Sequence, residues 1–360
     1  MNEATQIYPS DKRAMQQVNA LLEQEGIRLD RNLDYTCAIR DSEGRIIATG
    51  SLFQNTMRCF AVDHRHRGEG LLNRVISHLM EQELERGNLD LFLYTKPSSA
   101  RFFGDLGFYE IARVPDRLVF MENQSGGFAH CLQRFQQETQ AFLESRGLTI
   151  KDGTDGGDIA AIVMNANPFT KGHRHLVEQA SRENALVHLF LLSEDASLFP
   201  LAVRKALIEK GIADFGNVVL HESGPYIISN ATFPSYFLPD DDAASAGHAE
   251  LDLTLFAKIA AALSIRRRYV GEEPFSQVTS LYNKVMREKL PKLGIECRVI
   301  PRLAAHGRAI SASDVRQCIK EEDWQHLQDL VPETTLDCLK SPAAETVRAR
   351  IAAADIVRHH

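Results

Sequence analysis

The 360-residue sequence lacks the features of a membrane or secreted protein. No stretch approaches the roughly 18 consecutive apolar residues that a membrane span requires. The opening residues, MNEATQIYPSDKR, contain no apolar core of the kind found in signal peptides. The six cysteines form no CxxC pair and no dense framework, so a disulfide scaffold is excluded and reduced thiols are favoured. We therefore expect a soluble cytoplasmic protein with no membrane partner.

An excess of positive charge and a P-loop are also absent. Lys and Arg number 41 against 48 Asp and Glu, and the net charge of −7 gives no reason to expect nucleic-acid binding. The basic run Arg266-Arg267-Arg268 is interpreted as a solvated face. The pattern GxxxxGK(S/T) does not occur, which excludes the P-loop class of nucleotide-binding proteins.

The pattern of apolar residues changes along the chain. Residues 34–121 alternate short strand-like runs with turns around one helical stretch, which is an α+β pattern. From residue 159, continuous apolar runs alternate with helical patterns, as in a doubly wound parallel sheet. Breakers at 123–127 and 152–158 flank one further helical stretch. We predict an α/β protein with an α+β domain at 1–125, a helical linker at 126–157, a Rossmann-like domain at 158–340 and a helix or tail at 341–360.

The stretch NANPFTKGH, residues 165–173, lies where a predicted buried strand turns into a helix. The first amides of a helix have no partner within it, and the positive end of the helix dipole lies there, so this position suits an anion. Gly172 permits close approach of the backbone, Thr170 supplies a hydroxyl, and His173 supplies an imidazole that becomes a strong donor when protonated. The alternative is that Thr170 only caps the helix and His173 lies on its surface.

A second motif, ISASDVRQCI at residues 310–319, begins another predicted helix. The hydroxyls of Ser311 and Ser313, the free amides and the guanidinium of Arg316 can bind a pyrophosphate group from several directions. The alternative is an ordinary N-cap at Ser311 with Asp314 at the third helical position. Capping is compatible with phosphate binding, so the two interpretations do not exclude each other.

Together the motifs resemble the T/H-x-G-H and ISxSxxR signatures of the nucleotidyltransferase superfamily, which includes phosphopantetheine adenylyltransferase and class I aminoacyl-tRNA synthetases. The resemblance implies that these residues hold the phosphates of ATP and stabilise the pentavalent transition state at the α-phosphorus. Adenylyl transfer is therefore the predicted chemistry. Magnesium is expected with the ATP phosphates, although the sequence shows no dedicated carboxylate cage and no metal-ligating residue is assigned.

Five segments narrow the resemblance over nearly the whole chain: NANPFTKGHRHLVEQA, YIISNATFPSYF, LDLTLF, YVGEEPFSQVTSLYNKVM and ISASDVRQ. This set resembles the [citrate (pro-3S)-lyase] ligases. The resemblance implies that ATP activates acetate to acetyl-adenylate with release of pyrophosphate. The acetyl group would then pass to the thiol of the phosphoribosyl-dephospho-CoA group on the acyl carrier subunit of citrate lyase, with release of AMP. One departure is visible, because Glu272 stands where the family usually has the small hydroxyl residue of V-G-T-E-P, so no role is assigned to it.

The resemblance also suggests roles for individual residues. The predicted catalytic residues are His173, Thr170 and Lys171. The predicted ATP-binding residues are Asn165, Asn167, Pro168, Phe169, Gly172, Arg204, Asn283, Ser311, Ser313 and Arg316. Exposed surface positions are the alternative for Lys171, Arg204 and Asn283.

In the first domain, RHRGEG at residues 65–70 lies between a predicted strand and a predicted helix. It resembles the R/Q-x-x-G-x-G/A loop of the GNAT acetyltransferases, and SSARFFGDLGFYEIAR resembles the helix, turn and strand that follow in that family. The resemblance implies a GNAT-like domain in which Arg65, Gly68 and Gly70 bind the pyrophosphate of a CoA-like group through backbone amides. Binding of the carrier's prosthetic arm and a retained but inactive fold are both open, and no catalytic acid or base is singled out.

Other functions remain open at this point. The chain could be a GNAT N-acetyltransferase with a nucleotide-sensing second domain, a phosphopantetheine-type adenylyltransferase or a non-enzymatic binding module. Exchange of pyrophosphate into ATP that depends on acetate separates the ligase from all three.

Overall fold

The computed structural model describes residues 3–30, 32–150, 158–194, 197–229, 242–273 and 277–354. The chain divides into two compact units, residues 1–127 and 128–360. Parts of the segments YIISNATFPSYF and YVGEEPFSQVTSLYNKVM, of the predicted linker and of the predicted tail lie outside the described residues.

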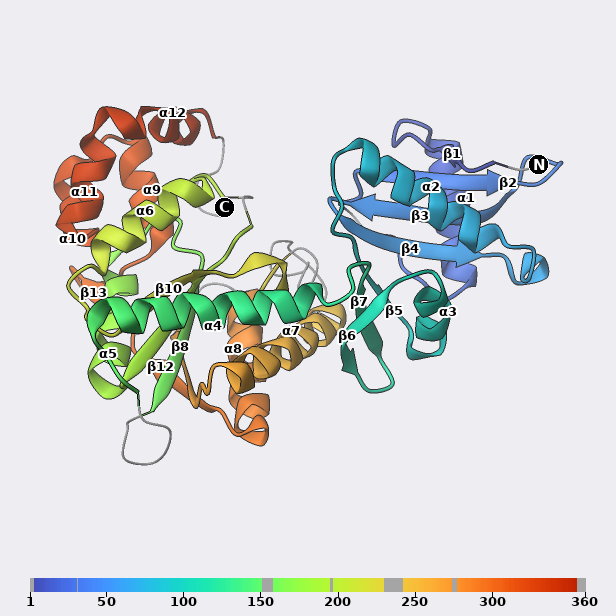
Figure 1. Ribbon diagram of the computed structural model, residues 1–360. Helices are drawn as coiled ribbons and strands as arrows, with labels where there is room; N and C mark the ends of the chain where they lie inside the picture. Colours follow the sequence, from blue (N-terminus) through green and yellow to red (C-terminus); the bar gives the residue numbers. More distant parts are fainter. Residues whose placement is uncertain are drawn as a thin grey trace. The chain divides into compact units, whose positions relative to one another are not determined.

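The first unit is a seven-stranded sheet with the strand order β1-β2-β3-β4-β5-β7-β6 (Figure 1). Its elements are β1 (Thr5–Gln6), α1 (Lys12–Gln24), β2 (Tyr35–Arg40), β3 (Ile46–Phe53), β4 (Thr56–Val62), α2 (Leu71–Glu85), β5 (Phe92–Thr95), α3 (Ala100–Asp105), β6 (Tyr109–Val114) and β7 (Leu118–Glu122).

Strands β4 and β5 form the one parallel pair among the described strands of this sheet. They pair at two positions only, Thr56 with Phe92 and Met57 with Leu93. Directly after these positions β4 contains an irregularity opposite β3, and Cys59 there has a φ of +54°. An otherwise antiparallel sheet with one short parallel pair, followed by a glycine loop and a helix, is the GNAT-like α+β architecture expected from the sequence.

The second unit is built on a five-stranded, fully parallel sheet with the order β10-β9-β8-β11-β12. Its elements are α4 (Gly127–Arg146), β8 (Ile159–Met164), α5 (Lys171–Glu183), β9 (Leu186–Leu191), α6 (Leu201–Gly211), β10 (Val218–Glu222), α7 (Asp242–Ala262), β11 (Arg267–Gly271), α8 (Gln277–Lys289), β12 (Glu296–Ile300), β13 (Ala304–Ala305), β14 (Arg308–Ala309), α9 (Ala312–Lys320), α10 (Trp324–Leu330), α11 (Glu333–Lys340) and α12 (Glu345–Ala353).

The strand order confirms the predicted doubly wound sheet. The chain starts in the middle at β8, adds β9 and β10 on one side, and then returns to add β11 and β12 on the other. Ligands of such sheets bind outside the carboxyl ends of the strands where the order reverses, and here that point lies between β8 and β11. The loops that follow β8 and β11 are therefore the first place to look for a site.

Helix α4 packs on the second sheet, although the sequence suggested that it lies in a linker (Figure 1). The Phe135 ring contacts the rings of Phe190 and His221, with centroids 5.2 Å away in both cases. Arg134 donates a hydrogen bond of 2.9 Å to the carbonyl oxygen of Glu222. At the other end of the chain, α12 contributes Ile351 to the same apolar core as β8. Both segments therefore belong structurally to the second unit.

The basic run at 266–268 is not a solvated face, because alternate residues of β11 point to opposite sides of the sheet. Arg268 is only 1% exposed, and its guanidinium lies 4.2 Å from the ring centroid of Phe256 and 5.5 Å from that of Tyr282. Arg267 forms ion pairs with Asp158 and Glu296. Arg266 is exposed, but the expectation was wrong for the run as a whole, because the apolar partners of Arg268 come from α7 and α8, the helices on either side of β11 in the sequence.

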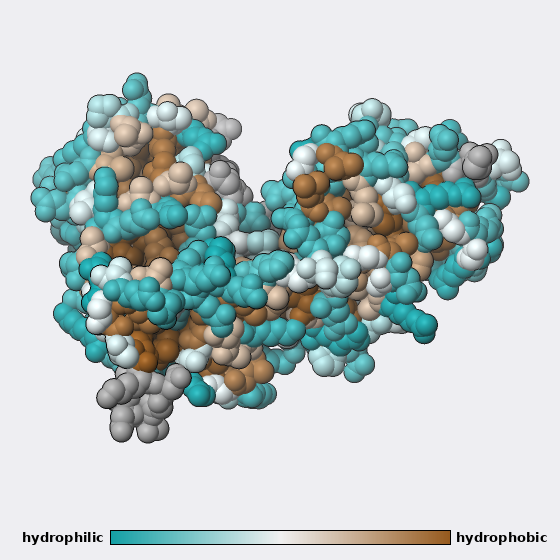
Figure 2. Space-filling view, viewed as in Figure 1, coloured by the Kyte–Doolittle hydropathy of each residue, from teal (hydrophilic) through white to brown (hydrophobic). Residues whose placement is uncertain are grey.

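On the face shown in Figure 2, hydrophilic residues surround smaller apolar areas on both units. Within the described ranges, no helix combines the length and the apolar character that crossing a membrane requires.

We expect Gly211→Ala to destabilise the second unit. A Cβ at residue 211 would lie 2.5 Å from Cε1 of Phe169, which is fully buried and has no room to move. Overpacking of this kind costs about 1–3 kcal/mol, partly offset by up to about 1 kcal/mol because alanine favours helix more than glycine does. Chemical denaturation of the full chain measures the difference. Gly216→Ala is the matched control, because nothing lies within 4 Å of a Cβ there, and an equal loss in both variants would contradict the packing argument.

Candidate functional site at the switch point

Thr170 and His173 form a reciprocal cap at the start of α5. The Thr170 hydroxyl oxygen accepts the N–H of His173 at 3.2 Å, and Nδ1 of His173 accepts the N–H of Thr170 at 3.1 Å. Thr170 is buried and His173 is half-buried, directly beyond the end of β8. The capping role suggested by the sequence is therefore present, and it also decides how the imidazole is oriented.

The cap determines which nitrogen of His173 carries the proton. Because Nδ1 accepts the Thr170 N–H, the neutral ring carries its hydrogen on Nε2. Burial, and to a lesser extent the positive charge of Arg302, lowers the pKa of His173 from 6.5 to about 4. Near neutral pH the protein thus holds His173 as a neutral Nε2–H donor. The protonated donor expected from the sequence is not the form that this environment favours.

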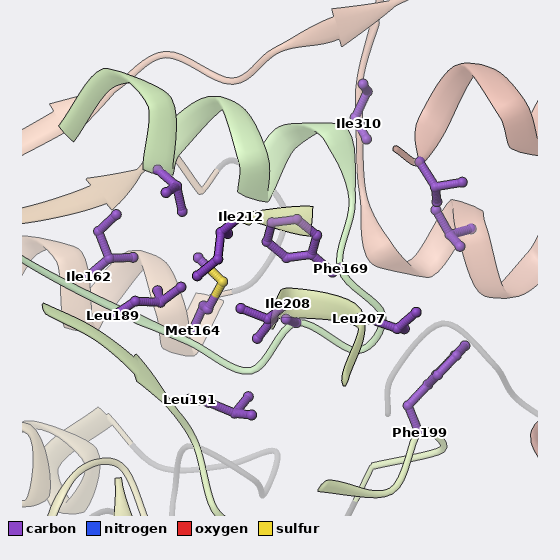
Figure 3. Packing of buried hydrophobic residues seen from close by; sticks show 14 of the residues in the cluster. Ile162, Met164, Phe169, Leu189, Leu191, Phe199, Leu207, Ile208, Ile212 and Ile310 are labelled. Atoms are coloured by element: carbon purple, nitrogen blue, oxygen red, sulfur yellow. The ribbon is translucent and has the colours of Figure 1, made fainter. Parts of the chain in front are cut away.

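Phe169 packs against the His173 ring from the side of the apolar core. The two rings lie nearly parallel, with an interplanar angle of 17° and centroids 5.9 Å apart. Phe169 is fully buried, and Figure 3 shows its ring beside Ile212 at the end of α6. The apolar core of the sheet therefore fixes the position of the imidazole, and the role of Phe169 is support from within that core.

The second motif lies against the first. Ser311 caps α9 by accepting the N–H of Asp314 at 3.0 Å, as the sequence suggested. Arg316 donates from Nη1 to the carbonyl oxygen of Asn167 at 2.5 Å and from Nη2 to the Ser313 hydroxyl at 3.1 Å. These bonds bring the N-termini of α5 and α9 together across 149 residues of sequence.

The two motifs also meet through their backbones. A Cβ at Gly172 would lie 3.7 Å from the carbonyl oxygen of Ile310, so a larger side chain there would press on the segment leading into α9. A Cβ alone would make only ordinary contacts there, so the close approach of a ligand at Gly172 stays a prediction.

The Arg316 guanidinium is a buried positive charge. The residue is only 3% exposed, and burial lowers its pKa to about 10 although the charge of nearby Asp314 acts in the opposite direction. A depressed pKa means that the charged form is held at a free-energy cost. An anion bound beside Arg316 would offset that cost, which is the property expected of a phosphate site.

The Arg204 guanidinium binds oxygens of the protein. It is fully buried, and its guanidinium donates to the carbonyl oxygens of Asn165, Leu192, Glu194 and Phe199 at 2.7–3.0 Å, and also to the Asn165 side chain. These bonds connect the loops after β8 and β9. Because its donors bind protein oxygens, Arg204 positions these loops, and its contact with the nucleotide stays a prediction.

Asn165 and Asn167 also order the same loops. The Asn165 amide donates to the Ser197 hydroxyl at 3.1 Å, and Oδ1 of Asn167 accepts the N–H of Phe199 at 3.1 Å. Pro168 lies between Asn167 and Phe169 in this loop. Both asparagines therefore bind protein groups and connect the loop after β8 to the loop after β9.

Lys171 and Asn283 follow different strands of the sheet, since Lys171 begins α5 after β8 and Asn283 lies in α8 after β11. The Lys171 ammonium donates to the carbonyl oxygen of Gln328 at 2.9 Å and so ties α5 to α10. Asn283 is 7% exposed, and its amide donates to the carbonyl oxygen of Gly271 at 3.0 Å, at the carboxyl end of β11. The exposed alternative is therefore wrong for Asn283, which lies at the β11 side of the switch point.

Arg302 is a candidate that the sequence analysis missed. It follows β12, and its guanidinium donates to the carbonyl oxygen of Glu272 at 2.7 Å and to Oε2 of Glu273 at 2.5 Å. Its charge acts on His173. The rule that ligands meet the carboxyl ends of parallel strands would have singled it out. The Glu272 side chain is exposed, so only its backbone takes part, which explains why an unusual residue fits there.

Metal-type donors are sparse near these motifs. Across the residues that the structure describes, one group of three such donors is close enough to share an ion: Cys318, Asp323 and His326, at the junction of α9 and α10. None of them is among the predicted site residues, and Asp323 already caps α10. No protein cage for magnesium is found in the described parts of the crevice.

In the first unit, the loop before α2 has an open helix N-terminus. Gly68 and Gly70 have φ values of +85° and +71°, and nothing lies within 4 Å of a Cβ at either position. Gly70 caps α2 without a side chain. The Arg65 side chain is 63% exposed and paired with Asp63 at 2.7 Å, so it borders the loop. This geometry suits an anion held by backbone amides.

The two sheets define the class of the protein: a GNAT-like α+β unit followed by a Rossmann-like unit in which the N-termini of α5 and α9 meet.

Residues 159–339 match the family model described as the citrate lyase ligase C-terminal domain. The chain is 37% identical to the [citrate (pro-3S)-lyase] ligase of Klebsiella pneumoniae over 91% of this chain and 93% of that protein. It is 36% identical to the protein of the same name from Haemophilus influenzae, over 92% and 96%, and 35% identical to that of Escherichia coli, over 94% and 93%. The chain belongs to the [citrate (pro-3S)-lyase] ligase family of enzymes.

A solved aminoglycoside 6'-N-acetyltransferase complexed with coenzyme A covers 33% of this chain and 94% of its own, at 11% identity and a TM-score of 0.29. The GNAT-like fold therefore rests on the strand order of the first unit and not on this similarity.

We expect the His173 ring to titrate far below the usual histidine range. Nitrogen NMR of the full chain should show hydrogen on Nε2 and a midpoint near pH 4. Since the folded pKa lies below the unfolded value near 6.5, the unfolded chain binds more protons between these pH values. The free energy of unfolding therefore decreases through this histidine as the pH falls from about 6.5 to 4. His173→Gln identifies the resonance, and a midpoint near 6.5 would contradict the assigned burial.

Proposed function

We propose that the protein activates acetate with ATP and transfers the acetyl group to citrate lyase. The carboxylate attacks the α-phosphorus, pyrophosphate leaves, and acetyl-adenylate forms. The thiol of the phosphoribosyl-dephospho-CoA group on the acyl carrier subunit then attacks the acetyl carbon, a thioester forms, and AMP leaves as the thiol loses its proton. The observation that carries the proposal is the junction of the two helix N-termini at the switch point, made by Arg316 and Asn167. The names of relatives at 35–37% identity support citrate lyase as the protein that is acted on.

The geometry suits attack of one anion on another, which needs fixed donors where negative charge develops. The Nε2–H of His173, oriented by Thr170, serves as a donor to the phosphate oxygens around the α-phosphorus. Arg316, with the hydroxyls of Ser311 and Ser313 at the start of α9, binds the departing pyrophosphate. Asn283, which binds the Gly271 carbonyl at the carboxyl end of β11, is the candidate contact for the rest of the nucleotide.

Magnesium accompanies the nucleotide in this proposal. Mg²⁺ retains several waters and is commonly held by substrate phosphates together with one or two carboxylates, so a dedicated protein cage is not required. The described residues near the motifs agree with this arrangement, because Asp314 lies beside the Ser311 hydroxyl at 2.8 Å. The ion would neutralise charge on the phosphates while the chain's own donors orient them.

The two units have different tasks in this proposal. The second unit, with its predicted domain at 158–340, forms the acyl-adenylate. The GNAT-like unit, with its predicted domain at 1–125, binds the phosphate groups of the prosthetic arm at Gly68, Gly70 and the start of α2, with Arg65 beside them. The left-handed glycines leave the amides there unobstructed.

Acetate should drive exchange of labelled pyrophosphate into ATP by the purified chain. His173→Asn keeps an oxygen that can accept the Thr170 N–H but has no donor in place of Nε2, so it should lower the exchange rate about 10²–10³-fold with little loss of stability. Pyrophosphate exchange at the same rate with and without acetate would contradict the ligase function. Exchange driven instead by a phosphopantetheine compound would establish an adenylyltransferase of that type.

Valine at Gly68 or Gly70 should slow acetylation of the carrier subunit about ten-fold while acetate-dependent exchange stays at the wild-type level. Side chains at these left-handed positions would strain the loop and cover its amides. Gly44→Val is the matched control, because Gly44 has a φ of +80° and open space in a hairpin of the same unit. If both activities fall together, or if the control falls as far, the proposed division of tasks is wrong.

A further inference from the structure

Arg302 carries a positive charge at the carboxyl edge of the second sheet, and the proposed function assigns no role to it. Arg302 leaves the carboxyl end of β12 and reaches the loop after β11, where it binds Glu272 and Glu273. It is close enough to His173 to lower the pKa of that ring. Arg302 therefore lies on the same edge of the sheet as the two motifs, on the β11 side of the switch point.

The other cations of the site are held differently. Arg204 binds main-chain oxygens deep in the loops. Lys171 binds the end of α10. Arg316 is 3% exposed and ties the two motifs together. Arg204 and Lys171 thus bind protein carbonyl oxygens, and Arg316 is already assigned to the pyrophosphate in the proposed function.

Arg302 is held by a partner that can be exchanged. Its side chain is 23% exposed and that of Glu273 is 14% exposed, so both border solvent. Their contact is a carboxylate–guanidinium pair at 2.5 Å. A guanidinium binds a phosphate with the same planar geometry that it uses for a carboxylate, and a polyphosphate carries more charge than one carboxylate.

Resting on the proposed function, we propose that Arg302 is a ligand of the ATP polyphosphate and that Glu273 occupies it until the nucleotide binds. ATP displaces the Glu273 carboxylate from Arg302. The carboxylate then turns away, because the negative charge of the bound phosphates repels it. The contact between Arg302 and the Glu272 carbonyl keeps the guanidinium at the crevice during this exchange. Glu273 thereby sets how tightly ATP is held, because nucleotide binding must first break the ion pair.

The test compares MgATP affinity of full-length variants by isothermal titration calorimetry without acetate. Arg302→Ala should raise the dissociation constant about ten-fold, the loss expected for one charge-assisted contact. Glu273→Gln should lower it about two- to five-fold, because a neutral amide competes less well for the guanidinium. Arg298→Ala is the control, since it removes an arginine of β12 with its own ion pair to Glu296 and should leave the affinity unchanged.

Melting temperatures and acetate-dependent exchange separate the outcomes. If Arg302→Ala has a lower melting temperature but binds MgATP with wild-type affinity, Arg302 only connects the loops after β11 and β12. The inference is then wrong. If Glu273→Gln weakens binding as much as Arg302→Ala does, Glu273 supports the site and does not compete with ATP, which also overturns it. Should Arg302→Ala fail to fold, Arg302→Lys must show the same loss of affinity.

The two proposals fail in different ways. Wild-type protein that binds MgATP but shows no acetate-dependent exchange contradicts the proposed function, and the affinities still decide the role of Arg302. Wild-type protein that does not bind MgATP contradicts both.

Discussion

The hydrogen bond from Arg316 to the carbonyl oxygen of Asn167 is the interaction on which the site depends. The N-terminus of α5 and that of α9 are each weak anion sites alone, since a helix dipole is screened within its first turn. Arg316 places them side by side by donating to the first loop from the second motif. Its own burial then adds a positive charge where little solvent remains to compete with a ligand.

Buried arginines bound to main-chain oxygens recur in this unit. Arg204 connects the loops after β8 and β9 in the way that Arg316 connects the two motifs. Burying a guanidinium is costly unless its donors are satisfied, so each such residue requires its loop carbonyls to stay in place. The loops are thus pre-organised by charges that the fold has already desolvated. A site that stabilises developing charge needs this rigidity, because donors that must first reorient lose most of their effect.

Much of this arrangement could be predicted from the sequence, and the limits have physical causes. Strand β8, the capped start of α5 and the capped start of α9 are local features, decided by apolar runs and by capping residues such as Thr170 and Ser311. The burial of Arg268 and the ion pair of Arg302 depend on contacts with residues of other elements, which spacing alone does not reveal. Arg204 illustrates the same limit, because the position of an arginine at a helix start does not reveal its carbonyl partners. The docking of α4 through Phe135 has the same origin.

The neutral state of His173 follows from the charges around it. With Arg302 acting on it and with little solvent to stabilise an imidazolium, a second positive group is unfavourable there. The arginines supply fixed charge, since a guanidinium stays protonated even with its pKa lowered to about 10. The histidine supplies an oriented hydrogen-bond donor, because its bond with Thr170 decides which ring nitrogen carries the hydrogen. Charge and orientation thus come from different residues, and neither changes across the physiological pH range. The site would therefore present the same donors to a phosphate at pH 6 as at pH 8.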